Sequence, residues 1–172
     1  MPPTFAAPTA AAIPMFTVHT DDLETTLANL PNAASDWLRN GGFDATIGAS
    51  ALLPNPDGTI KAVYVGLGAK GQARVRFGVA AGAATLPQGT YQLDTTLTGP
   101  ALDEAALGLL LSTYRFGRYK HTPAAKQAFI APAGVDAGKI EAIAAGECLT
   151  RDLITRPRPT WGPLNSPKQH TI

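Results

Sequence analysis

The chain has 172 residues, a length typical of one compact domain and short for two. Hydrophobic residues make up 45% of it, enough to build a core, whereas charged residues make up 16% and the net charge is +1. This balance argues against a polyanionic partner such as a nucleic acid. A single cysteine, Cys148, excludes an intramolecular disulfide and indicates a reducing, cytoplasmic location.

Nothing in the chain predicts a membrane partner. No apolar run approaches the roughly 20 residues that a membrane span needs. Residues 1–7 lack the positive charge and the continuous apolar core of a signal peptide. Residues 1–14 are rich in proline and alanine, and we expect them to form a disordered tail.

The first third of the chain predicts one strand and two helices. Residues 15–19 are a strand candidate, and residues 20–22 (Thr-Asp-Asp) offer caps for a helix over 23–30. Pro31 stops that helix, and a second helix is predicted over 34–40, ahead of two glycines.

The middle of the chain predicts a hairpin, a helix and a strand. Residues 47–53 and 60–65 have the composition of strands, joined by the Pro-Asn-Pro-Asp-Gly turn at 54–58. Apolar residues at helical spacing predict a short helix over 73–84, and alternation predicts a strand over 91–97.

The last third predicts a helix over 101–113, a strand over 128–131 and a long helix over 136–154. Strands interleaved with helices indicate an α/β domain, and the hairpin adds an antiparallel pair to the sheet. The sequence therefore predicts a mixed sheet flanked by helices.

A glycine-rich run matches the dinucleotide fingerprint G-x-G-x-x-G, with glycines at Gly66, Gly68 and Gly71. It lies between a predicted strand and a predicted helix, and Asp94 follows 23 residues after Gly71. One interpretation is a phosphate-binding loop at a helix N-terminus. The favoured interpretation is a turn whose glycines serve the backbone, because the hairpin before the run breaks the order of a dinucleotide-binding fold.

Signals for metal binding and for a nucleophile are weak. The three histidines, His19, His121 and His170, are far apart in the sequence. Asp21 and Asp22 next to His19 could be ligands, but they are better explained as helix caps.

Three further residues with reactive side chains also have structural explanations. Cys148 lacks a C-x-x-C partner and is predicted to be a small core residue. Asp103 and Glu104 are predicted on the first turn of a helix, where acids offset the dipole.

Aromatic and basic residues alternate after the 101–113 helix. The run comprises Tyr114, Arg115, Phe116, Gly117, Arg118, Tyr119 and Lys120. It could stack nucleic-acid bases, but we favour aromatic packing between helix and sheet with the basic heads in solvent.

Two segments carry a family resemblance: residues 114–120 and the later segment 146–154, Gly-Glu-Cys-Leu-Thr-Arg-Asp-Leu-Ile. They resemble the leucyl aminopeptidase (cytosol aminopeptidase) family, in which Y-x-F-x-x-Y-K ends a helix of the N-terminal domain. There, A-R-D-L-I-N-T-P leads into the catalytic domain. The resemblance covers roughly residues 15–154.

The resemblance implies a macro-domain-like N-terminal domain over 15–135 and a linker helix over 136–154. Full-length relatives are homo-hexameric metalloaminopeptidases that use two divalent metals, Zn or Mn, held by the catalytic domain. The signatures of that domain, N-T-D-A-E-G-R and V-G-K-G, are absent here. The resemblance therefore assigns no catalytic, cofactor-binding or metal residue, and we expect this chain to be inactive on its own. The alternative is a small macro-like module that binds a nucleotide or ADP-ribose.

The residues after Ile154 depart from the family pattern and form a Pro-rich stretch, 155–172. Read one base out of frame, the codons of 154–163 permit Asn-Thr-Pro-Ala-Ala-Asp-Met-Gly-Pro, which is the family's continuation. We therefore expect a frameshifted or truncated family member whose residues 155–172 form an aberrant tail.

Overall fold

A computed structural model describes residues 3–71, 77–114 and 126–154. The frameshift hypothesis concerns residues 155–172, which lie outside these ranges. The described elements are, in chain order, β1 (Ile13–His19), a 3-10 turn η1 (Thr20–Asp22), α1 (Leu23–Ala28), α2 (Asn32–Asn40), β2 (Ser50–Pro54), β3 (Ile60–Gly68), α3 (Gly78–Ala84), β4 (Gly89–Asp94), α4 (Gly99–Ser112), β5 (Gln127–Ile130) and α5 (Ala137–Ile154).

The five strands form one mixed sheet in the order β2-β3-β1-β4-β5. β2 pairs antiparallel with β3, which confirms the hairpin at 54–58. The other neighbours are parallel: β1 lies between β3 and β4, and β5 pairs with β4. The predicted α/β class with a mixed sheet is therefore correct.

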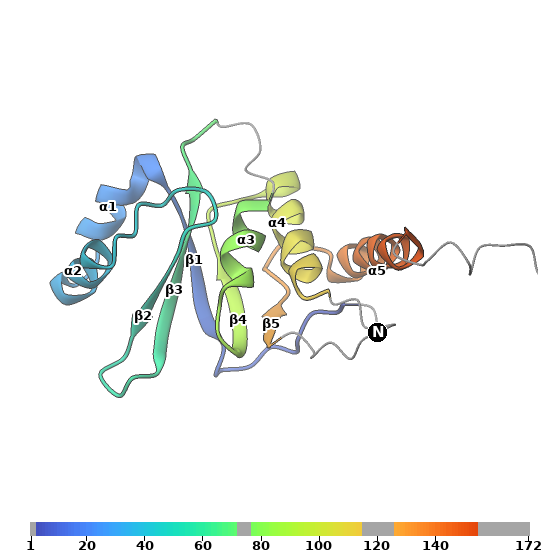
Figure 1. Ribbon diagram of the computed structural model, residues 1–172, viewed down its shortest axis with the longest axis horizontal. Coiled ribbons are helices and arrows are strands. Elements are labelled where there is room, and N and C mark those ends of the chain that lie inside the picture. Colours follow the sequence, from blue (N-terminus) through green and yellow to red (C-terminus); the bar gives the residue numbers. More distant parts are fainter. Residues whose placement is uncertain (1–2, 72–76, 115–125, 155–172) are drawn as a thin grey trace, which may run out of the picture.

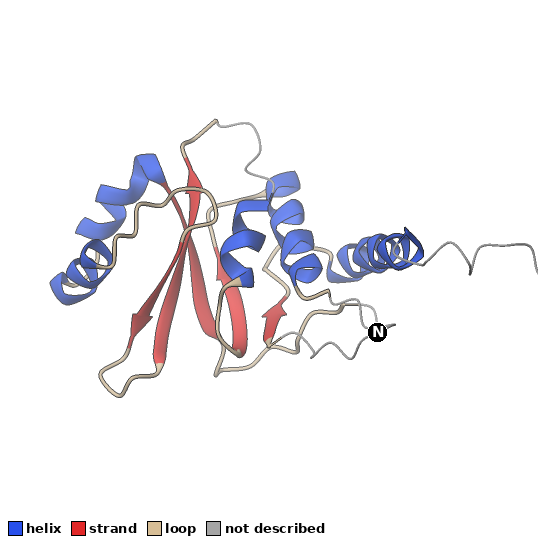
Figure 2. Ribbon diagram, in the orientation of Figure 1, coloured by secondary structure: helices blue, strands red, loops and turns tan. Residues whose placement is uncertain are grey.

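Helices cover both faces of the sheet (Figures 1 and 2). On one face, α1 and α2 pack on β1, β2 and β3 through a cluster that includes Leu27, Leu38 and Tyr64. On the other face, α3 and α4 cover a larger cluster that includes Met15 and Tyr91. β3 is buried on both faces from Ala62 to Gly68, as a central strand requires. α5 lies outside α4 and packs against it through Ile140 and Ala144.

Every element differs from its predicted bounds by one or more residues at one end or both. β2 begins at Ser50 and not at residue 47, because Ala45 and Gly48 take positive φ values of 55° and 79°. β4 ends at Asp94, because the Thr95 hydroxyl accepts the Leu97 backbone N–H and turns the chain. The helix predicted from residue 73 begins at Gly78, with Phe77 at its N-cap, and residues 73–76 of the prediction lie outside the described residues.

The segment before β1 contacts the fold, although the sequence suggested a disordered tail. The backbone N–H of Ala6 donates to the carbonyl of Phe129 at 2.7 Å, and Ala6 forms a parallel bridge with Ile130. The N–H of Phe5 donates to the Glu141 carboxylate at 2.8 Å. The Phe5 side chain packs against two core clusters. Residues 5 and 6 therefore join β5 to α5.

Candidate functional site

The first two glycines of the glycine-rich run are part of the sheet. Gly66 and Gly68 are the last residues of β3, where residues 45–49 cross their backbone. Gly66 exchanges two backbone hydrogen bonds with this crossing segment, 2.8 Å from its N–H to the Ala49 carbonyl and 3.1 Å from the Gly48 N–H to its own carbonyl. The N–H of Gly68 donates to the Ala45 carbonyl at 2.9 Å.

Gly66 is required by this crossing. A Cβ on Gly66 would lie 2.1 Å from the Thr46 carbonyl oxygen and 2.5 Å from the Ala45 carbonyl carbon, both of them backbone atoms. Gly68 and Gly71 instead take positive φ values of 73° and 77°. Each glycine of the fingerprint therefore has a structural explanation.

The position of Asp94 also differs from that of a fingerprint acid. It ends β4, which is separated from β3 by β1, since Phe16 pairs with both Tyr64 and Asp94. A dinucleotide fold needs this acid on the strand next to the glycine loop. The order of the strands therefore argues against a dinucleotide site.

The residues from His19 to Asp22 hold the turn that follows β3. The His19 ring lies with Nδ1 3.1 Å from the Gly68 carbonyl oxygen, which can only accept, so Nδ1 carries the proton in this contact. The Asp21 carboxylate accepts the Lys70 backbone N–H at 2.6 Å. Asp22 pairs with the Lys70 ammonium, also at 2.6 Å. The side chains of His19, Asp21 and Asp22 therefore contact other residues of this chain, Gly68 and Lys70.

Asp21 and Asp22 lie in the first turn of η1, and Asp22 is the N-cap residue of α1, but their side chains do not form the predicted capping hydrogen bonds. Neither η1 nor α1 has a side-chain hydrogen bond at its N-cap. The Asp21 carboxylate accepts the Lys70 backbone N–H and the Asp22 carboxylate pairs with the Lys70 ammonium, so both are engaged by a residue distant in the sequence. Within the described ranges, no group of three or more His, Cys, Asp or Glu side chains could hold a metal ion.

Cys148 and Asp103 have structural explanations. Cys148 is buried, which raises the pKa of its thiol and leaves it protonated at neutral pH. α4 begins at Gly99 with Pro100 in its first turn, so Asp103 and Glu104 lie beyond the first turn, contrary to the prediction. The Asp103 carboxylate lies 3.6 Å from the Lys139 ammonium of α5.

The structure describes only Tyr114 of the aromatic and basic run. Its hydroxyl donates to the Asp152 carboxylate at 2.5 Å, and the Arg151 guanidinium lies 5.7 Å from its ring centroid. Loss of solvent and then the bond to Asp152 raise the pKa of Tyr114 to about 12. Tyr114 thus packs on α5. The other members of the run, together with His121 and His170, lie outside the described residues.

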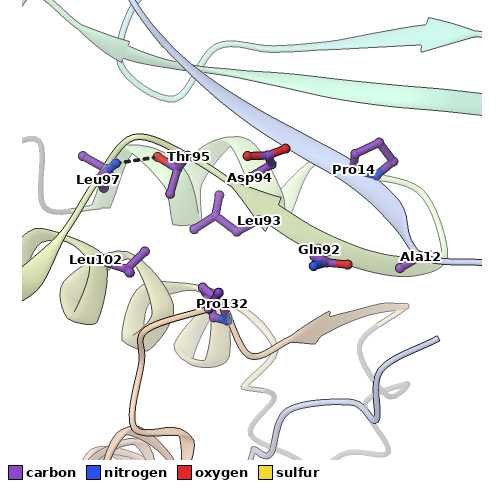
Figure 3. A pocket seen from close by; sticks show the side chains of 10 residues that line it. Ala12, Pro14, Gln92, Leu93, Asp94, Thr95, Leu97, Leu102 and Pro132 are labelled. Atoms are coloured by element: carbon purple, nitrogen blue, oxygen red, sulfur yellow. Dashed lines mark hydrogen bonds between the residues drawn. The ribbon is translucent and has the colours of Figure 1, made fainter. Parts of the chain in front are cut away.

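A pocket opens beside the carboxyl end of β4, with a volume of about 400 Å³ (Figure 3). Leu93, Leu102 and Pro132 are buried residues of its lining, whereas Gln92 and Asp94, which alternate with Leu93 along β4, are exposed. Sequence reasoning singled out Asp94 only as a fingerprint acid and did not find this pocket. Its remaining walls come from separate segments: Ala12, Pro14, Thr95, Leu97 and Ala133.

Comparison with known proteins identifies the class. Residues 13–132 match the model of the M17 aminopeptidase N-terminal domain. No curated protein sequence matches the chain. The solved structure of cytosol aminopeptidase from Coxiella burnetii shares the fold, with a TM-score of 0.80 and 21% identity over 91% of this chain and 34% of that one.

Two more solved structures agree. The bottromycin maturation enzyme BotP is similar with a TM-score of 0.63 and 28% identity, over 89% of this chain and 35% of that one. A mutant of tomato leucine aminopeptidase is similar with a TM-score of 0.63 and 15% identity, over 90% of this chain and 37% of that one. The chain belongs to the M17 leucyl aminopeptidase family, as its N-terminal domain. It spans about a third of the length of these solved relatives.

Proposed function

We propose that this domain is the non-catalytic part of a metal-dependent aminopeptidase that removes N-terminal residues from peptides. In this proposal a separate catalytic domain holds two divalent metals, Zn or Mn, which activate the attacking water. One relative, BotP, was solved in complex with Mn. The role proposed for the present domain is to support that catalytic domain.

The observation that carries this proposal is the outer surface of α5. Leu149 and Ile154 are 57% and 78% exposed, and Ile143 is 42% exposed. They are exposed, whereas Ile140, Ala144 and Cys148 of the same helix are buried against the domain. Large apolar side chains gathered on one helix indicate a surface that another protein unit covers. We propose that the catalytic domain covers it, because the solved relatives are about three times as long as this chain.

The same proposal extends to assembly and location. We propose that the intact protein forms homo-hexamers in the cytoplasm, with the N-terminal domains shaping access to the active sites. Support for the location comes from the single, buried cysteine and from a neighbour named as a cytosol aminopeptidase. No helix in the described ranges is long and apolar enough to cross a membrane.

The proposal is tested by activity with and without a catalytic domain. The purified 172-residue chain, given Mn or Zn, should not hydrolyse leucine p-nitroanilide above a metal-only control. The DNA after codon 154 should encode a catalytic domain in another frame, and a one-base correction should yield an active enzyme. Turnover that co-purifies with the uncorrected chain would contradict the proposal, and so would downstream DNA that encodes no such domain.

A further inference from the structure

One edge of the sheet is open at β2. β2 is the outermost strand on its side, and no described strand pairs with its outer edge (Figure 1). The opposite edge differs, because Ala6 forms a parallel bridge with Ile130 of β5. Proteins commonly protect an open edge with charged residues or proline, which resist pairing. β2 carries no charge, and Pro54 is its last residue, so residues 50–53 remain open to pairing with another strand.

The register of β2 determines which of its backbone groups face outward. The Gly66 N–H donates to the Ala49 carbonyl at 2.8 Å, one position before Ser50. Hydrogen-bonded and non-hydrogen-bonded pairs alternate along an antiparallel ladder. Ser50 and Leu52 therefore direct their N–H and C=O groups away from β3. A side-chain contact agrees with this direction, because the Leu52 carbonyl accepts the indole N–H of Trp37 at 2.8 Å.

Apolar side chains flank the open edge on both faces of the sheet. Trp37 reaches the edge from α2 and is 54% exposed. Leu52 is 38% exposed and faces the opposite side, because its neighbour Leu53 is buried in the cluster under α1 and α2. A strand added to the edge would cover part of both exposed side chains, which removes apolar surface from water.

The open edge is complementary to a second copy of itself. Antiparallel pairing about a two-fold axis at Ala51 would place Ser50 opposite Leu52 of the second copy, and Leu52 opposite its Ser50. Each of these pairs exchanges both of its outward N–H and C=O groups. A carbonyl oxygen can accept two hydrogen bonds, so the bond from Trp37 leaves the Leu52 carbonyl able to accept one from a strand.

The residues at the two ends of β2 select this register. With the axis at Leu52, Ser50 would lie opposite Pro54, which has no N–H to donate. With the axis at Ser50, Leu52 would lie opposite Gly48, whose N–H already donates to the Gly66 carbonyl at 3.1 Å. Because β2 has no charged residue, the pairing places no like charges opposite each other.

We propose that the open edge of β2 docks a second copy of this chain, whose β2 pairs with it antiparallel about a two-fold axis at Ala51. The two sheets then form one continuous sheet, with both α2 helices on the same face. This interface is small, so the dimer is weak, with a Kd on the order of 100 µM. The inference is independent of the proposed function, because the pairing requires neither a catalytic domain nor the surface of α5.

Disulfide trapping tests both the pairing and its register. The Cα atoms of a non-hydrogen-bonded antiparallel pair lie about 4.5 Å apart, which suits a disulfide. In the 172-residue chain carrying Cys148→Ala, Ala51→Cys should therefore form a covalent dimer under mild oxidation. Ser50→Cys is the matched control, because the two copies of residue 50 would lie about 9 Å apart and should cross-link at least about fivefold less.

Sedimentation equilibrium measures the dimer without a cross-link. All chains carry Leu149→Lys, so that the apolar surface of α5 does not contribute. Leu52→Lys should raise the Kd at least about tenfold, because a charge at an edge opposes pairing. Gln92→Lys makes a matched change at an exposed position of β4 and should leave the Kd within about twofold of the parent chain.

Three results would overturn the proposal. The first is a parent chain that stays monomeric at concentrations up to about five times the expected Kd. The second is equal cross-linking of the Ala51→Cys and Ser50→Cys chains, which would exclude the register. The third is an unchanged Kd for Leu52→Lys when circular dichroism shows that this variant is folded, which would place the contact between copies elsewhere.

Discussion

Replacing Gly66 with alanine tests whether the glycine-rich run serves the fold. The new Cβ would lie 2.1 Å from the Thr46 carbonyl oxygen and 2.5 Å from the Ala45 carbonyl carbon. Both atoms belong to the backbone, so no side-chain rotation can relieve the clash. The backbone of residues 45–49 would have to move. That movement would strain or break the hydrogen bonds that join Gly66 and Gly68 to Ala45, Gly48 and Ala49.

The cost follows from two contributions. Forcing extra volume into a packed site costs about 1–3 kcal/mol. The three backbone hydrogen bonds of the crossing contribute about 1 kcal/mol each, and we expect at least one to be lost. Gly66→Ala should therefore lower the free energy of unfolding by about 2–4 kcal/mol. For a chain of this length, that corresponds to a fall in Tm of about 5–15 °C.

Urea unfolding followed by circular dichroism measures this change, and Gly146→Ala is the matched control. A Cβ on Gly146 meets nothing within 4 Å, and the residue lies inside α5. This control should be neutral or stabilising by up to about 1 kcal/mol, because alanine favours helix. If Gly66→Ala unfolds within about 0.5 kcal/mol of the original chain, the reasoning about the crossing is refuted.

Three further predictions follow from other parts of the structure. Tyr114→Phe should cost about 1 kcal/mol at pH 7. Because the folded state raises the pKa of Tyr114 from 10.0 to about 12, its stabilising contribution is complete below pH 10 and is lost as pH rises through 12. Urea midpoints should thus fall more between pH 10 and 12 for the original chain than for the variant, and parallel curves would contradict this. Leu149→Lys should reduce self-association in light scattering and change the free energy of unfolding by less than about 0.5 kcal/mol, because the side chain is exposed; unchanged scattering would show that this surface is not adhesive. Calorimetric titration with NAD or ADP-ribose should give no saturable heat, and a micromolar Kd would restore the nucleotide interpretation.

The sequence was sufficient for the order and type of the described elements. The hairpin turn at 54–58 and the stop at Pro31 depend on local chemistry, which a sequence displays directly. Asp136 illustrates this at the start of α5, where its carboxylate accepts the Lys139 backbone N–H at 3.1 Å. The bounds predicted from the sequence were wrong where contacts with a distant segment determine the end of an element. Residue 47 is an example, because residues 45–49 cross the end of β3 before β2 begins.

The difference between local and distant contacts also explains which predictions about site residues succeeded. Asp21 and Asp22 stand where helix caps are expected, yet their carboxylates bind Lys70, and no local pattern contains that competitor. The pocket was missed for a related reason. The residues that line it include residues of β4, of α4 and of the segment after β5, which only the order of the strands brings together. A polar residue that ends a parallel strand, as Asp94 does, was the one available signal.

The two segments that carried the family resemblance meet in the structure. Tyr114 belongs to the first and Asp152 to the second, and the Tyr114 hydroxyl donates to the Asp152 carboxylate across 38 residues of sequence. Arg151, also in the second segment, places its guanidinium near the same ring. This contact joins the end of α4 to the end of α5, beyond the packing of Ile140 and Ala144. The motifs thus hold α5 in a fixed direction, and α5 carries the apolar surface proposed to meet the catalytic domain. The pair therefore has a physical role: by joining the ends of α4 and α5, it fixes the direction in which α5 presents that surface.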